Sequence, residues 1–126
     1  MTASELAATT NVPTPAPTAR RVVTFSATIH IAGSVERIRD VCRAFCLRGL
    51  CVTVTPTEYI YTGGSESGAA VGLINYPRFP SEPERIRATA RELAAVLMSE
   101  CCQRSCSVVC SDETEYLENK DIVIPR

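Results

Sequence analysis

Residues 22–46 read VVTFSATIHIAGSVERIRDVCRAFC, and the pattern of this stretch changes once, at Gly33-Ser34. Before that point apolar residues alternate with polar ones, which is the period of a strand with one buried face. The apolar side consists of Val23, Phe25, Ala27, Ile29 and Ile31, and the polar side of Thr24, Ser26, Thr28 and His30. The stretch therefore begins with a predicted strand whose polar side stays open.

After Gly33 the apolar residues recur at steps of three and four, which is the period of an amphipathic helix. Ser34 is the predicted N-cap, and Gly49 marks the end of the helix. The buried stripe consists of Val35, Ile38, Val41, Cys42, Phe45 and Cys46.

Two further strands are predicted in residues 50–61 and 69–75. The first is rich in β-branched and aromatic residues but contains Pro56, which has no N–H to donate and therefore predicts an edge strand or a bulge. Residues 62–68, TGGSESG, predict a flexible hairpin connection, so the two strands should pair antiparallel.

A second helix should begin after Pro80, because Ser81 and Glu84 have the spacing of a capping box and Pro83 is tolerated in a first turn. Its apolar stripe is Ile86, Ala90, Leu93, Ala94, Leu97, Met98 and Cys101. Residues 105–110 alternate again as a strand, and residues 114–117 are a candidate for one more short strand.

This order predicts an α+β, ferredoxin-like βαββαβ domain: an antiparallel sheet with two helices on one face and the other face open. We expect the domain to span residues 21–118, between a disordered Thr/Ala/Pro-rich tail at 1–20 and a C-terminal tail at 119–126. Pro13, Pro15 and Pro17 favour extended, solvated chain, and contact with a neighbouring subunit is the expected cause of any order there.

Composition excludes several classes of function. The 126 residues include 13 basic and 14 acidic side chains, so no global positive field exists to bind long nucleic acid. There is no run of about 18 apolar residues to span a membrane and no apolar signal segment. We expect a cytoplasmic protein with no membrane partner.

The seven cysteines are odd in number and include no C-x2-C pair, which is the usual zinc knuckle. We interpret them as reduced thiols that mostly pack in the core, and expect no metal, no cofactor and no catalytic residue. One competing interpretation is a thiol enzyme that pairs Cys51 or Cys110 with His30, the single histidine.

The segment Asn75-Tyr76-Pro77-Arg78-Phe79-Pro80 is the best candidate for binding a ligand. It combines stacking rings, an amide and a guanidinium with two stiffening prolines, a combination that suits a nucleotide. The predicted ligand-binding residues are Tyr61, Asn75, Tyr76, Arg78, Phe79 and Arg104. Alternatively, Tyr76 and Phe79 only fill the junction between sheet and helix, and Gly63-Gly64 forms a plain hairpin turn rather than an anion-binding nest.

The motifs TPTEYIYTGG in residues 55–64, GLINYPRFP in 72–80 and SEPE in 81–84 resemble small proteins carried by tailed phages and prophages. The likeness covers about residues 22–117 and implies no catalytic residues. Phage proteins of this size often counter host defence. One such class, the oligomeric anti-Thoeris and anti-CBASS sponges, sequesters cyclic nucleotide or cyclic ADP-ribose signals.

The expectation from sequence is thus a non-enzymatic, homo-oligomeric phage-type protein that sequesters a small anionic nucleotide-derived signal to counter host defence. The alternative is a protein–protein inhibitor or assembly module that acts through the open sheet face or the Pro56 edge. The Gly63-Gly64 turn and residues 75–80 should lie about 20 Å apart at the two ends of one strand. A ligand that touched both would have to bind between subunits.

Overall fold

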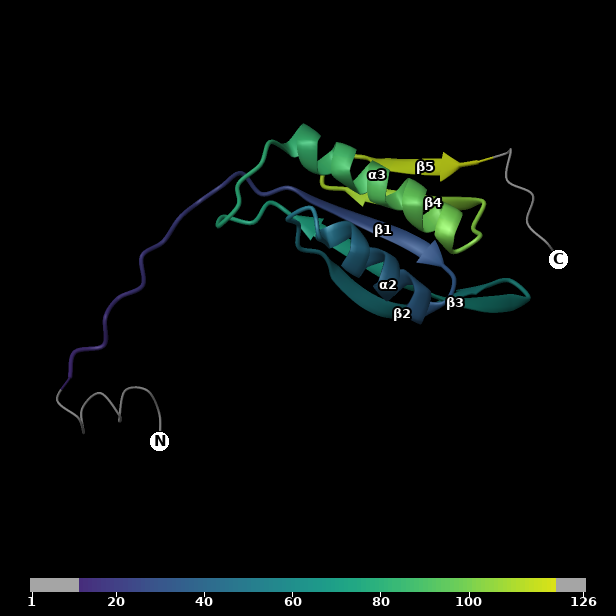
Figure 1. Ribbon diagram of the computed structural model, residues 1–126, viewed down its shortest axis with the longest axis horizontal. Coiled ribbons are helices and arrows are strands. Elements are labelled where there is room, and N and C mark those ends of the chain that lie inside the picture. The colour runs from purple at the N-terminus through teal and green to yellow at the C-terminus, as the bar shows by residue number, and fades with distance from the viewer. Residues whose placement is uncertain (1–11, 120–126) are drawn as a thin grey trace.

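The structure is a computed structural model in which residues 12–119 are described. Figure 1 shows the elements in chain order. They are β1 (Ser26–Ala32), α2 (Val35–Cys46), β2 (Thr53–Tyr61), β3 (Gly64–Ile74), α3 (Pro83–Glu100), β4 (Ser105–Cys110) and β5 (Thr114–Glu118).

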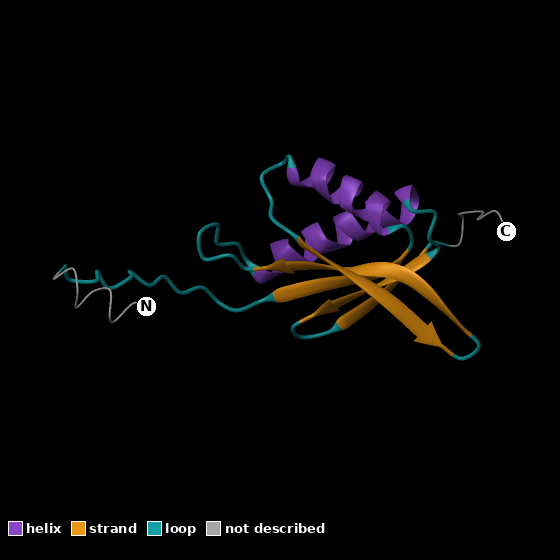
Figure 2. Ribbon diagram, turned by 90° about the horizontal axis from the view of Figure 1, so that it is seen from below, coloured by secondary structure: helices purple, strands orange, loops and turns teal. Residues whose placement is uncertain are grey.

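The five strands form one antiparallel sheet in the order β2-β3-β1-β4-β5. Both helices cover the same face, and Figure 2 shows the other face free of helices. This confirms the α+β class with two helices on one side. The sheet has one strand more than the βαββαβ pattern, and that strand, β5, is the short strand for which residues 114–117 are the candidate. Pro56 lies in β2, an edge strand, as expected from its missing N–H.

The core lies between the helices and the sheet. The predicted apolar face of β1 is buried from Ala27 to Ile31, and Phe25 just before it is buried as well, but Val23 is 70% exposed. The helix stripes meet this face with Ile38, Val41, Cys42, Phe45, Ile86, Ala90, Leu93, Ala94, Leu97 and Met98. Ser34 accepts a hydrogen bond from the Arg37 backbone N–H at 3.3 Å and so caps α2 as predicted.

Two local predictions are wrong. The β2–β3 hairpin turns on Thr62-Gly63 alone and β3 already begins at Gly64, because Gly63 at φ +85° makes a tight turn possible. The N-cap of α3 is Glu82 and no side chain caps it. Ser81 instead donates its backbone N–H to Asn75 Oδ1 at 2.9 Å.

The chain enters the domain through an extended segment. Residues 12–25 have no regular secondary structure, and residues 12–20 are exposed. Residues 1–11 and 120–126, with the rest of the two predicted tails, lie outside the described part. Among residues 12–119, neither helix is long and apolar enough to cross a membrane.

Candidate functional site

The structure does not bring the six predicted ligand-binding residues into one place. Tyr61 closes the β2–β3 hairpin and Arg104 precedes β4, at the same end of the sheet, whereas residues 75–79 follow β3 at the opposite end (Figure 1). No single ligand site within one subunit can therefore include all six.

Asn75 has a structural position. It is 8% exposed, its Nδ2 donates to Val23 O at 2.8 Å, and its Oδ1 accepts from the Ser81 N–H. Arg78 is exposed and its guanidinium lies 5.5 Å from the centre of the Phe79 ring. Backbone groups thus take up the donor and the acceptor of the Asn75 amide, whereas the Arg78 guanidinium lies at the surface.

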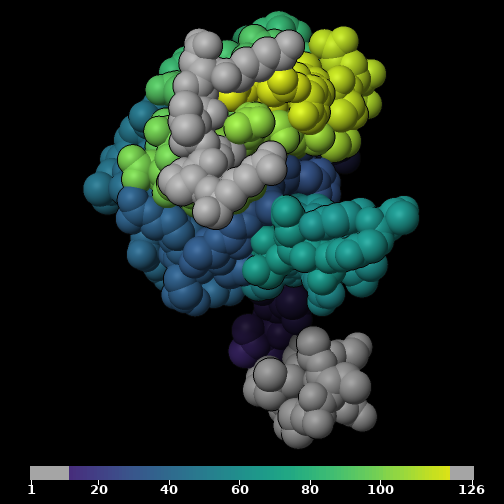
Figure 3. All heavy atoms as spheres, turned by 90° about the vertical axis from the view of Figure 1, so that its right-hand side faces the viewer, coloured from purple at the N-terminus to yellow at the C-terminus, as the bar shows by residue number. Residues whose placement is uncertain are grey.

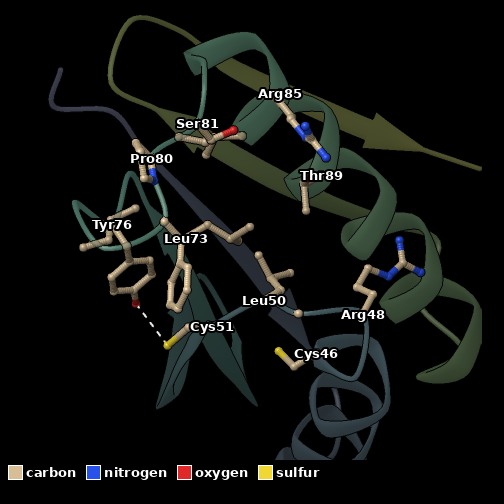
Figure 4. A pocket seen from close by; sticks show the side chains of 14 residues that line it. Cys46, Arg48, Leu50, Cys51, Leu73, Tyr76, Pro80, Ser81, Arg85 and Thr89 are labelled. Carbon is tan, nitrogen blue, oxygen red and sulfur yellow. Dashed lines mark hydrogen bonds between the residues drawn. The ribbon is translucent and has the colours of Figure 1, made fainter. Parts of the chain in front are cut away.

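Tyr76 and Phe79 line a cavity of about 630 Å3, which we call the loop groove. Its walls come from the end of α2, the end of β3 and the start of α3, and Figure 4 shows Tyr76 and Cys51 on one side with Arg85 and Thr89 on the other. Among the described residues, two arginines and no carboxylate line the groove, and one of the two, Arg48, is paired with Glu92 outside it. Its charge therefore favours neutral or anionic groups over cations.

Cys51 donates its thiol hydrogen to Tyr76 Oη at 3.4 Å in this groove, a contact that raises the pKa of Tyr76 to about 12. Among residues 12–119, no acceptor takes the proton of the Tyr76 hydroxyl. The interpretation as a thiol enzyme built on His30 finds no support, because His30 contacts Tyr59 and not a thiol. Burial raises the pKa of Cys110, the other proposed nucleophile.

A second group of polar side chains lies on the open sheet face. We call His30, Tyr59, Tyr61 and Glu66 the tyrosine cluster. Tyr59 Oη donates to Ala69 O at 3.0 Å and lies 3.2 Å from His30 Nδ1. The Tyr59 hydroxyl already donates its only proton to Ala69 O, so His30 Nδ1 must donate to Tyr59. In the neutral imidazole Nε2 is then an acceptor, and no donor within residues 12–119 is bonded to it.

Two glycines make room for the rings of this cluster. A Cβ at Gly68 would lie 2.9 Å from the Tyr59 ring, and one at Gly64 would lie 3.1 Å from the Tyr61 ring. Tyr59 can therefore cross β3 and reach His30 on β1. Glu66 pairs with Tyr59 across the strands, and Tyr61 Oη donates to Glu66 Oε1 at 3.4 Å. Burial is the main cause that raises the pKa of Tyr59.

The cluster offers one carboxylate beside two aromatic rings, together with an imidazole acceptor. This is an environment for a small organic cation, because carboxylate and ring faces both attract positive charge. The predicted site residues include only Tyr61 from this set. The alternation of residues 23–31 places His30 on the open face. The pairing of Tyr59 with Glu66 depends on the register of β2 and β3, and the flexible connection predicted for residues 62–68 does not specify a register.

No protein-family model and no curated protein matches the chain. Two solved structures share its fold. A phage SAM lyase in the apo state superposes with a TM-score of 0.68 at 15% identity, covering 83% of this chain and 98% of the lyase. A phage SAM lyase in complex with S-methyl-5′-thioadenosine superposes with a TM-score of 0.59 at 16% identity, covering 85% and 98%.

These likenesses establish the fold, and they agree with the expected resemblance to phage proteins. They also correct one expectation. The sequence favours a protein without enzymatic activity, yet both structures with this fold are named as lyases, which are enzymes. The names of these structures contradict the expectation of a non-enzymatic protein.

Proposed function

We propose that the chain is a phage-type enzyme that cleaves S-adenosylmethionine (SAM) and releases S-methyl-5′-thioadenosine, so that a nucleoside-derived molecule used by the host is removed. The likeness to two phage SAM lyases along 98% of their length supports the reaction class. Within this chain, the observation that supports the proposal is the tyrosine cluster.

Charge decides between the two candidate sites. SAM carries a sulfonium cation, and the loop groove is lined by arginines without a carboxylate. The tyrosine cluster has Glu66, which lies beside Tyr59 on the open face and accepts a hydrogen bond from Tyr61. A sulfonium ion gains attraction from the carboxylate and from the ring faces there, so we place SAM on the open face.

The reaction breaks the bond between the sulfonium sulfur and Cγ of the amino-acid chain. Both electrons of that bond go to sulfur, which becomes the neutral thioether of S-methyl-5′-thioadenosine. The four-carbon fragment can then complete its valence in two balanced ways. Its own carboxylate oxygen can bond to Cγ and close a lactone, or a base can take a proton from Cβ so that a Cβ–Cγ double bond forms. In the second route His30 Nε2 is the proton acceptor.

Glu66 acts in binding more than in the chemical step. The positive charge on sulfur disappears as the bond breaks, so a neighbouring carboxylate stabilises bound SAM more than the transition state. A dry environment favours this loss of charge. The open face provides no cover of its own, since Tyr61 is 53% exposed, and we propose that a second copy of the chain covers the cluster.

The test is to incubate the full-length protein with SAM and to identify the products by mass spectrometry. We expect S-methyl-5′-thioadenosine, with a lactone or an unsaturated amino acid that identifies the route. Glu66→Gln should raise KM about tenfold and change kcat less, because it loses one charged contact to the substrate. The matched control is Glu58→Gln, which makes the same change on the neighbouring strand β2, on the opposite face of the sheet.

Two results would contradict the proposal. One is a folded protein that releases no S-methyl-5′-thioadenosine at any SAM concentration. The other is turnover in which Glu66→Gln behaves like Glu58→Gln, which would place the substrate away from the tyrosine cluster.

A further inference from the structure

The chain carries an exposed proline-rich arm, residues 12–17, with the sequence VPTPAP. Such a segment favours the polyproline II helix, which has three residues per turn and no internal hydrogen bonds. At that period Val12 and Pro15 share one edge, Pro13 and Ala16 share the next, and the third edge holds Thr14 and Pro17. Two neighbouring edges of the arm are therefore apolar, and its backbone carbonyls need donors.

The loop groove has the features that a polyproline II helix requires. Phe79 is 69% exposed and Ile74 is 49% exposed at its rim, and Tyr76 stands between them in sequence on a segment that Pro77 and Pro80 stiffen. Stiff, exposed aromatic side chains form the kind of surface to which proline-rich segments bind. Exposed apolar side chains that gather at one cavity, as Ile74 and Phe79 do, indicate a binding surface more strongly than isolated exposed residues.

Donors for the carbonyls of the arm are also present. Tyr76 accepts the Cys51 thiol hydrogen, and no acceptor within the described part of the chain takes its own hydroxyl proton. Arg85 lines the groove, and none of the ion pairs among residues 12–119 includes it. Figure 4 shows Tyr76 and Arg85 on opposite sides of the groove, so both walls can donate hydrogen bonds to an extended chain lying between them.

The arm and the groove lie at the same end of the molecule. Asn75 joins them, since its backbone N–H donates to Phe25 O at 3.0 Å and its side chain donates to Val23 O. Figure 1 shows the arm leaving the domain at this end and running away from it. Residues 18–22, TARRV, contain no glycine or proline to reverse the chain toward its own groove.

We propose that the proline-rich arm of one copy docks as a polyproline II helix in the loop groove of a second copy. The apolar edges formed by Val12 with Pro15 and by Pro13 with Ala16 face Phe79 and Tyr76. The docking is independent of the proposed lyase activity, because it uses neither the open face nor the tyrosine cluster. Docking gives the arm a defined position, which the composition of the arm alone does not provide.

Isotope-filtered NMR tests this directly on the full-length protein. Labelled and unlabelled chains are mixed in equal amounts, and contacts are sought between the Pro15 protons of one and the ring protons of Tyr76 and Phe79 of the other. We expect these contacts between chains. Contacts only within a chain would show that each arm folds onto its own groove, and an absence of contacts would show that the arm does not dock; either outcome overturns the proposal.

Substitutions make the test specific to one edge of the arm. Phe79→Ala and Pro15→Gly should each lower the population ratio of docked to free arm about tenfold, as expected for an interface anchor. Pro17→Gly is the matched control, because it loosens the arm equally but lies on the third edge, and its effect should stay below about twofold. Equal effects of Pro15→Gly and Pro17→Gly would overturn docking by these edges. Phe79 is too exposed for its loss to unfold the domain.

Discussion

At the scale of single residues, Gly68 decides whether the tyrosine cluster can form. A Cβ at this position would lie 2.2 Å from Ile31 O and 2.9 Å from the Tyr59 ring. The first contact is with backbone of the neighbouring strand, which a rotamer change cannot relieve. The absence of a side chain at position 68 thus lets β1 approach closely and lets Tyr59 lie across β3 toward His30.

We therefore expect Gly68→Ala to lower the free energy of unfolding by about 1–3 kcal/mol, the usual range for forcing an extra methyl into a packed site. Urea denaturation followed by circular dichroism measures the change. Gly64→Ala is the control, since its Cβ would press on the exposed Tyr61 ring, which can turn away. Equal losses for the two variants would contradict the role given to the Ile31 carbonyl.

At the scale of elements, Arg87 connects α3 to the turn between β4 and β5. Its side chain is 6% exposed and donates to Asp112 Oδ2 at 2.5 Å, to Glu84 Oε2 at 3.3 Å and to Glu113 Oε1 at 3.4 Å. The guanidinium also lies 5.3 Å from the centre of the Phe25 ring. A buried charge with three carboxylates around it fixes where the β4–β5 turn lies against the helix.

This connection predicts a dependence of stability on pH. The hydrogen bond from Arg87 holds the pKa of Asp112 below its ordinary value. A carboxyl whose pKa is lower in the folded protein stabilises the fold above its unfolded pKa, about 3.9, and loses that contribution as pH falls through the folded value. Arg87→Met should therefore lower the urea midpoint clearly at pH 7, and the difference from the unaltered protein should shrink at pH 2.

A surface pair provides the comparison for this measurement. Arg39 contacts Glu36 at 3.1 Å, and the Glu36 side chain is 82% exposed, so solvent screens the pair. Arg39→Met should leave the urea midpoint nearly unchanged at both pH values. A deficit of Arg87→Met that stayed constant from pH 7 to pH 2 would mean that lost packing, and not the carboxylates, is responsible.

At the scale of the whole molecule, the sheet is covered on one face only (Figure 2). Figure 3, which views the molecule from the side that lies to the right in Figure 1, shows the β2–β3 hairpin extending beyond the rest of the domain. Apolar side chains are exposed on the face without helices, including Val109 at 38% and Tyr116 at 64%. Exposed apolar residues on one uncovered face favour contact with another copy, which the proposed function requires.

If copies associate through the open face as proposed, we expect Val109→Glu to lower the number of associated subunits, because it places a charge on that face. Native mass spectrometry reports the number of subunits. Leu47→Glu is the control: Leu47 is 88% exposed but lies at the end of α2, away from the open face. If Val109→Glu and the unaltered protein show the same subunit number, the open face is not the contact surface.

The sequence by itself determined the elements whose patterns are local. The alternation in residues 25–31 and the helical spacing after Ser34 indicate β1 and α2, and Pro56 indicates an edge strand. In each case the informative residues lie within one element, so periodicity and the chemistry of proline are sufficient. The two helices on one face followed from the same patterns, because each element must bury its apolar side.

The tertiary structure alone decided which side chains meet. Tyr59 reaches His30 because β3 begins at Gly64, which places Gly68 beneath the Tyr59 ring. This placement depends on the register among β2, β3 and β1. Asn75 looked like a ligand-binding amide, but two backbone groups from residues far apart in sequence occupy it. Contacts between segments depend on how the sheet closes, and local sequence patterns do not contain that information.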